Sequence, residues 1–125
     1  MEGNYQSRAE MAIAAMLRQY SVSFRHEYPM AVQDRGRLRL WYPDFVLPEQ
    51  GVVIEYNGLP EKPECRERQE HKRFVFAEMG LPALFLEPSD LRGRYAERIL
   101  NWMESVQEKR LGKVRQAQAV SQRQF

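Results

Sequence analysis

The chain has 125 residues, of which 43% are hydrophobic and 29% are charged, and its formal net charge is +2. This composition is typical of one globular domain with a genuine core, and no apolar run approaches the roughly 18 residues of a membrane span. Because the first residues are polar rather than an apolar signal, we expect a cytoplasmic, intracellular protein without membrane contact. The single cysteine, Cys65, excludes a disulfide framework and a cysteine-based zinc site, and we expect it to be a packed or surface thiol.

The first expected element is a helix that begins after Ser7 and ends near Tyr20. Ser7 can serve as its N-cap, and Glu10, three residues later, would complete a capping box. Apolar residues such as Ile13 and Leu17 then recur at helical spacing. We expect this apolar side, which also carries Glu10, to face a sheet.

Two strands joined by a tight turn are expected next, over residues 24–32 and 37–47, with the turn at residues 34–36. A second turn at residues 48–51 leads into Val52–Tyr56. This run is almost wholly apolar, which predicts a central strand that is covered on both faces.

The second half of the chain predicts a helix over residues 64–79 that Gly80 ends, a short strand over residues 83–86, and a last helix from about Leu91 to about Lys109. The order of elements is therefore α-β-β-β-α-β-α. We expect an α/β fold with a mixed four-stranded sheet flanked by helices, in which the third and fourth strands are parallel, and an extra C-terminal helix.

The end of the chain is basic. After Glu108 there are five basic residues and no acidic one, so the rest of the chain is acidic on balance. We expect a single domain over residues 1–108 and a basic tail over residues 109–125. The tail could contact a polyanion or could be a solvated terminus, and the sequence does not favour either. The basic residues are Lys109, Arg110, Lys113, Arg115 and Arg123.

Two carboxylates mark the expected ends of adjacent strands. Asp44 precedes an apolar stretch, and Glu55, eleven positions later, lies near the end of the central strand. A buried carboxylate is costly unless it is paired or coordinates an ion, and hard divalent cations prefer oxygen ligands. The pattern therefore predicts a metal site at Asp44 and Glu55.

The matched motif is Pro43-Asp44, ten intervening residues, then Glu55-Tyr56-Asn57. It resembles the PD-(D/E)XK nuclease superfamily, whose restriction-endonuclease-like fold has an αβββαβ core. The resemblance covers roughly residues 7–90 and is nearest to the small very-short-patch-repair and transposon-end-cleaving members. It implies that Asp44 and Glu55, with the backbone carbonyl of Tyr56, hold Mg²⁺, for which Mn²⁺ can substitute. It also implies metal-dependent hydrolysis of DNA phosphodiester bonds.

Asn57 departs from the family pattern, which usually places a lysine there. Asparagine can hydrogen-bond a water or a phosphate oxygen, but it supplies no positive charge. Lys72 is a candidate substitute from the following helix, where Gln69, Lys72 and Gly80 fit the spacing of related nucleases. Lys72 could equally be a surface lysine that extends over an apolar helix face.

Glu10 has two competing interpretations. Family members often bring a glutamate from the first helix to the metal, whereas the capping box explains the residue without a metal. His71 lies beside Lys72 on a different helix face, and we expect it to be a solvated residue. Basic and polar residues around the expected cleft are predicted to contact nucleic acid: Arg37, Arg39, Lys62, Arg66, Gln69 and Arg73, with Lys109, Arg110 and Lys113 of the tail.

The sequence thus predicts a Mg²⁺-dependent endodeoxyribonuclease. The leading alternative is a catalytically impaired nuclease fold that binds nucleic acid or a partner protein, and Asn57 is the residue that favours it. A nuclease that acts on RNA is a third interpretation. Since no helix-turn-helix or zinc finger is present, we expect weakly specific, structure-selective or partner-directed cleavage, and a homodimer would explain cleavage of both strands.

Overall fold

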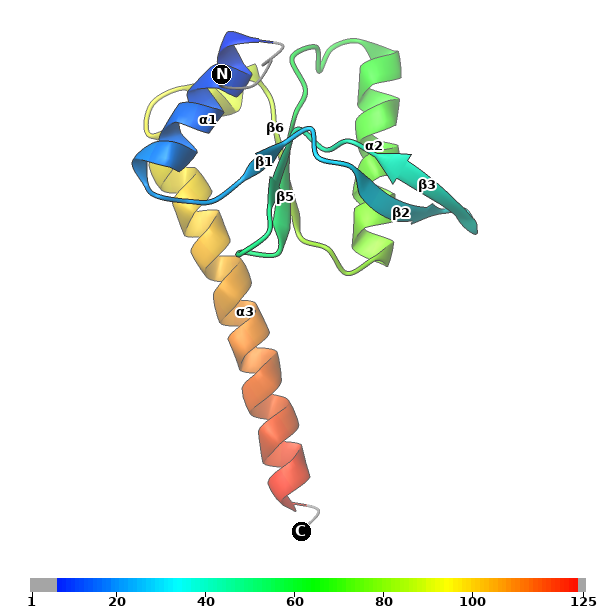
Figure 1. The fold of residues 1–125 in the computed structure, drawn as a ribbon, viewed down its shortest axis with the longest axis vertical. Coiled ribbons are helices and arrows are strands. Elements are labelled where there is room, and N and C mark those ends of the chain that lie inside the picture. The colour runs from blue at the N-terminus through cyan, green and yellow to red at the C-terminus, as the bar shows by residue number, and fades with distance from the viewer. Residues whose placement is uncertain (1–6, 124–125) are drawn as a thin grey trace. The chain divides into compact units, whose positions relative to one another are not determined.

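The computed structural model describes residues 7–123. The chain divides into two compact units, one ending at Gly93 and one beginning at Arg94, and each is described by itself. The elements of the first unit are α1 (Arg8–Gln19), β1 (Arg25–His26), β2 (Met30–Asp34), β3 (Arg37–Trp41), β4 (Phe45–Leu47), β5 (Val52–Tyr56), α2 (Pro63–Glu78), β6 (Ala83–Leu86) and the 3₁₀ helix η1 (Pro88–Leu91) (Figure 1).

The main sheet has four strands in the order β1-β4-β5-β6. β4 is antiparallel to both β1 and β5, whereas β5 and β6 are parallel and are joined through α2. The predicted α/β class and mixed four-stranded sheet are therefore confirmed. β2 and β3 form a separate two-stranded antiparallel sheet.

The two long strands predicted over residues 24–32 and 37–47 are wrong, because each is broken into two strands that belong to different sheets. The first break follows Glu27, which has a left-handed φ of 51° and is soon followed by Pro29. The second break lies at Pro43 and Asp44. Proline has a fixed φ and no N–H to donate to a strand ladder, so both sites favour a change of direction.

Helices α1 and α2 lie on opposite faces of the main sheet (Figure 1). Val53 packs in a buried cluster with Val75 and Phe76 of α2. Because side chains alternate along a strand, Glu55 points to the same face as Val53, and therefore towards α2. The alternation of side chains along β5 therefore directs the Glu55 carboxylate into the space beside α2.

The β2–β3 hairpin is closed by a two-residue turn at Arg35 and Gly36, whose φ angles of 54° and 77° are those of a primed turn. One side of the hairpin packs on α2, where the Trp41 ring meets the Phe76 ring edge-on at a centroid distance of 5.6 Å. Asp34, at the end of β2, is buried beneath this contact region at 7% exposure. The β2–β3 hairpin thus covers part of α2 next to the main sheet.

The predicted limits of the first two helices are confirmed to within a residue or two, and Gly80 follows α2 with a φ of 67°. The last helix, α3 (Tyr95–Arg123), differs from the prediction at both ends. It begins after η1 and after Gly93, whose φ is 62°, and it continues beyond Lys109 through the basic residues. None of the helices in the described range is long and apolar enough to cross a membrane.

Candidate active site

A cavity of about 390 Å³ lies between α1, the ends of β4 and β5, and α2. We call it the Asp44 cavity. It gathers seven residues that the sequence predicted to act at one site: Glu10, Asp44, Glu55, Tyr56, Asn57, Gln69 and Lys72. These residues come from α1, α2, β5 and the residues just before β4 and just after β5, so the cavity exists only in the folded chain. Cys65, a partly buried free thiol, also lines it.

Two hydrogen bonds join Asp44 to β5, one to Glu55 and one from Tyr56. The backbone N–H of Asp44 donates to Glu55 Oε1 at 3.0 Å, and the backbone N–H of Tyr56 donates to Asp44 Oδ2 at 2.7 Å. The register that pairs Phe45 with Ile54 places each carboxylate beside the backbone of the other strand. The two carboxylates are therefore positioned by the strand pairing itself.

The electrostatic environment of Asp44 disfavours its negative charge. Burial raises the pKa of its carboxyl group, the neighbouring charge of Glu55 raises it further, and the result is a pKa of about 7. The Tyr56 N–H and the more distant Lys72 act in the opposite direction, while Glu10 adds to the increase. Burial and the neighbouring acids thus disfavour a charged Asp44, which is a condition that a bound cation relieves.

Lys72 extends from α2 to the carboxylate pair. Its Nζ lies 2.9 Å from Glu55 Oε2, and its side chain is 29% exposed. The interpretation of Lys72 as a surface lysine over an apolar face is therefore wrong, because its charge is directed into the cavity. Arg68 lines the cavity one helical turn earlier, and its spacing from Lys72 is the sequence signal that could have identified it.

Asn57 and Gln69 differ in how their amide oxygens are used. Asn57 Oδ1 accepts a hydrogen bond from the backbone N–H of Leu59 at 3.0 Å, so its oxygen is committed to the loop after β5. Gln69 Oε1 is buried and has no hydrogen-bond partner within the described chain. A buried acceptor without a partner is costly in a folded protein, which favours a ligand or water beside Gln69.

Glu10 is buried at 5% exposure on the sheet-facing side of α1. The N-cap contact is confirmed, since the backbone N–H of Glu10 donates to Ser7 Oγ at 3.1 Å. The Glu10 carboxylate instead contacts His26 Nε2, at 3.0 Å from Oε1. Donor atoms of Glu10, His26 and Glu27 all lie within 4.8 Å of one another and could hold a cation. His26 and Glu27 were missed because they lie within the residues assigned to one continuous strand.

The carboxylates of the Asp44 cavity are ligands of the kind that hard divalent cations prefer. Asp44, Glu55 and Glu10 offer carboxylate oxygens, and Asp44 Oδ1 accepts no hydrogen bond from the described residues. Mg²⁺ is commonly held by one or two carboxylates with water and substrate oxygens completing its octahedron, and oxygen donors also suit Mn²⁺. Both Glu55 oxygens already accept hydrogen bonds, from the Asp44 N–H and from Lys72 Nζ. Among the described residues, the acidic and histidine group whose donor atoms lie within 4.8 Å of one another is Glu10, His26 and Glu27.

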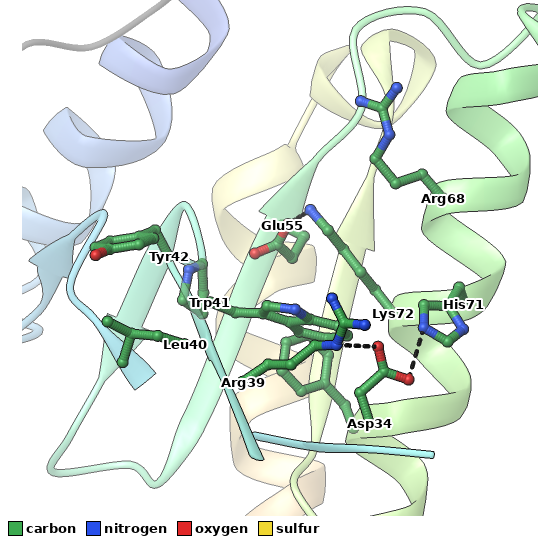
Figure 2. A pocket seen from close by; sticks show the side chains of 11 residues that line it. Asp34, Arg39, Leu40, Trp41, Tyr42, Glu55, Arg68, His71 and Lys72 are labelled. Atoms are coloured by element: carbon green, nitrogen blue, oxygen red, sulfur yellow. Dashed lines mark hydrogen bonds and ion pairs between the residues drawn. The ribbon is translucent and has the colours of Figure 1, made fainter. Parts of the chain in front are cut away.

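A second cavity of about 370 Å³ adjoins the first, and we call it the Trp41 pocket (Figure 2). Asp34 lies at its base, with Oδ1 at 3.0 Å from His71 Nε2 and Oδ2 at 3.4 Å from Arg39 Nε. The hydrogen bond with His71 lowers the pKa of Asp34, against the effect of burial. The expectation that His71 is a solvated helix residue is thus wrong. The sequence pattern indicates only that Asp34 belongs to a turn, and no local pattern pairs it with His71.

The residues predicted to contact nucleic acid are dispersed. Arg39 lines the Trp41 pocket, whereas Arg66 and Arg73 line a smaller hollow of about 230 Å³ together with Asn57 and Gln69. Arg66 donates to the Pro60 carbonyl, and the Arg73 guanidinium lies 4.3 Å from the centre of the Phe85 ring. The remaining five are Arg37 on β3 and Lys62 before α2, both exposed, and Lys109, Arg110 and Lys113 on α3.

No known family model and no curated protein matches this chain. The resemblance to the PD-(D/E)XK nucleases therefore depends on the motif and on the geometry around it.

Proposed function

We propose that this protein is a metal-dependent endonuclease of the restriction-endonuclease-like fold, which hydrolyses phosphodiester bonds in DNA. The observation that carries the proposal is the joining of Asp44, Glu55 and Lys72 in one cavity. Glu55 accepts hydrogen bonds from the backbone N–H of Asp44 and from the ammonium group of Lys72. These contacts join the start of β4, the end of β5 and α2. Seven residues chosen from the motif and its surroundings converge there.

The topology supports the fold assignment in its main features. A helix precedes the sheet, Asp44 immediately precedes β4, Glu55 lies in β5, and a helical crossover leads to the parallel strand β6. The departure from a simple αβββαβ core is the β2–β3 hairpin, which is inserted between β1 and β4 and forms its own sheet. The insertion leaves the Asp44–Glu55 pairing intact.

In this proposal Asp44 and Glu55, with Glu10 and the Tyr56 carbonyl, hold Mg²⁺ or Mn²⁺. The bound ion supplies an acidified water and offsets charge on the scissile phosphate. Lys72 takes the role of the family lysine, although it comes from α2 and not from the motif. Its ammonium group already lies at the Glu55 carboxylate, where it can orient a water or bind a phosphate oxygen. Asn57 retains only its amide N–H groups for a substrate, since its oxygen is bonded to Leu59.

Substrate binding would rely on positive charge around the cavity. Arg68 and Lys72 line the cavity, and Arg39 and Arg66 lie in adjacent hollows. Contacts of this kind to phosphates hold a backbone without reading its sequence. We therefore propose that the substrate is DNA and that the protein does not recognise a long base sequence. Where both strands are cut, a second copy of the chain would cut the second strand. A partner protein would direct the nuclease to its target.

The test is cleavage of supercoiled plasmid and of branched DNA in Mg²⁺ and then Mn²⁺. Wild type is compared with Glu55→Gln, which keeps the shape of a residue that is 2% exposed, and with Glu78→Gln, a matched change on the exposed end of α2. We expect metal-dependent nicking in wild type and Glu78→Gln and none in Glu55→Gln. DNA binding without cleavage in all three proteins would replace the proposal with the binding-only alternative, and cleavage of RNA alone would change the substrate.

A further inference from the structure

The Trp41 pocket adjoins the Asp44 cavity. Glu55, Arg68 and Lys72 line both spaces, so a group in the pocket lies directly beside the proposed scissile phosphate. Figure 2 shows Lys72 extending from α2 towards Glu55, and Asp34 joined by dashed lines to His71 and Arg39, with the Trp41 ring close to both groups. Whatever occupies the pocket is therefore a neighbour of the reacting phosphate.

The inner surface of the pocket is mainly aromatic and aliphatic. Its apolar residues are Leu40, Trp41, Tyr42, Pro43 and Phe76. Trp41 is held in place by edge-on contacts with the Phe76 ring at 5.6 Å and the His71 ring at 6.0 Å. Two contacts from α2 fix the indole, so that it forms a rigid wall rather than a mobile surface side chain.

Polar groups converge at one end of this apolar space. The Asp34 carboxylate is 9% exposed and is held between His71 and Arg39. The Arg39 side chain is itself 52% exposed and keeps N–H groups beyond the one that faces Asp34. An aromatic wall with a fixed carboxylate and a guanidinium at its edge offers stacking to a planar ring and both acceptors and donors to its periphery.

We propose that the Trp41 pocket receives a nucleobase of the nucleotide next to the scissile phosphate, taken out of its stack. This inference rests on the proposed function, because the occupant is placed by the phosphate that Lys72 and Arg68 would bind. A pocket of about 370 Å³ is large enough for the planar ring of a nucleobase and part of its sugar. The base stacks on Trp41, and its edge meets Asp34 and Arg39.

The inference has a direct consequence for substrate choice. Unstacking a base from intact duplex costs free energy, and the cost is least where the base is mismatched, damaged or single-stranded. Cleavage should therefore favour branched, mismatched or single-stranded DNA over perfect duplex, and it should show no need for a long recognition sequence.

The test uses tryptophan fluorescence. Trp41 and Trp102 are the two tryptophans of the chain, so Trp102→Phe on α3 leaves Trp41 as the only reporter. This variant is titrated without divalent metal with a short single-stranded oligodeoxynucleotide, and in parallel with an abasic strand of equal length. We expect the base-containing strand to quench Trp41 and to bind about 5- to 100-fold more tightly than the abasic strand, the range that stacking of one base supplies.

A second variant keeps the test independent of folding. Trp41→Leu, checked by circular dichroism and thermal melting, should bind the base-containing and abasic strands with equal affinity. Arg39→Gln should reduce the difference in affinity between the two strands without abolishing it. Equal binding of both strands by the Trp102→Phe protein, without quenching, would overturn the base pocket. Metal-dependent cleavage that vanishes in Glu55→Gln would then still support the nuclease. Base-dependent quenching in a protein that never cleaves DNA would instead show a base-binding pocket and overturn the nuclease, and with it the position of the base beside a scissile phosphate.

Discussion

The two adjoining cavities hold aspartates in opposite electrostatic situations. Asp34, in the Trp41 pocket, faces His71 and Arg39, and its pKa is lowered by the contact with His71. Asp44, in the Asp44 cavity, lies beside Glu55, and burial together with that second carboxylate raises its pKa to about 7. Asp34 thus has a guanidinium and an imidazole beside it within the fold, whereas two buried acids side by side indicate a place for an external cation.

The largest contrast between the cavities should appear in catalysis. Glu55→Gln removes a charged oxygen from the proposed metal site, and we expect the rate of DNA cleavage to fall at least about a hundredfold, since several kcal/mol of transition-state stabilisation come from such a site. Asp34→Asn changes a charge that is already paired, and we expect a loss of less than about tenfold. Single-turnover cleavage of a branched substrate measures both. Equal losses would remove the distinction between the two cavities.

Lys72 sharpens the comparison because it lines both cavities. Lys72→Met should lower the cleavage rate by about 10²-fold if its ammonium group acts on the phosphate or the water. Lys72→Arg should restore part of that rate. Arg68→Met is the matched change one turn earlier on α2, and it should mainly weaken DNA binding. Cleavage rates at saturating DNA separate the two effects, and a Lys72→Met protein as fast as wild type would return the family role to Asn57.

The raised pKa of Asp44 predicts how the metal-free protein depends on pH. Folding raises the pKa above the ordinary value of 3.8, so the folded state binds the proton more tightly than the unfolded state. Stability from this group is fully present below about pH 4 and is lost as the pH rises towards 7. In EDTA at pH 8, Asp44→Asn should therefore raise the free energy of unfolding by about 1–3 kcal/mol, measured by urea denaturation. At pH 4 the two proteins should be alike.

Asp34 should give the opposite and smaller result. Its pKa is lowered by His71, so its stabilising effect is present above the ordinary value of 3.8 and is lost as the pH falls through the folded-state pKa. Asp34→Asn should lower the melting temperature at pH 7, and the difference from wild type should shrink in acid. A melting temperature that rises at pH 7, as expected for Asp44→Asn, would contradict the pairing of Asp34 with His71 and Arg39.

Much of the Asp44 cavity could be predicted because local pattern and strand order determine it. The apolar run of β5 fixed the position of Glu55, and the spacing back to Asp44 placed the second acid on the neighbouring strand. Gln69 and Lys72 were indicated by the resemblance, through the spacing found in related nucleases, and both line the cavity. The strand positions depend on periodicity, which a single sequence records.

The Trp41 pocket could not be predicted in the same way. It depends on the hairpin leaving the main sheet after Glu27 and Pro29, and on contacts between Asp34 and His71, which are 37 positions apart. Alternating residues made two long strands the simpler interpretation. Pro43 is a local sign that the strand can be interrupted, but it does not show that the two parts belong to different sheets. Tertiary contacts decided both the break in the strands and the role of His71.

The most direct test of the central claim is calorimetric titration of the wild-type protein with Mn²⁺ at pH 6 and pH 8, in pairs of buffers that differ in ionisation enthalpy. Asp44 faces Glu55 from β5, Glu10 from α1 and Lys72 from α2, and its pKa of about 7 leaves it mostly protonated at pH 6. Mn²⁺ binding should then release about one proton at pH 6 and about a tenth of a proton at pH 8, and Asp44→Asn should bind Mn²⁺ far more weakly. Absence of Mn²⁺ binding, or binding at pH 6 without proton release, would contradict the account.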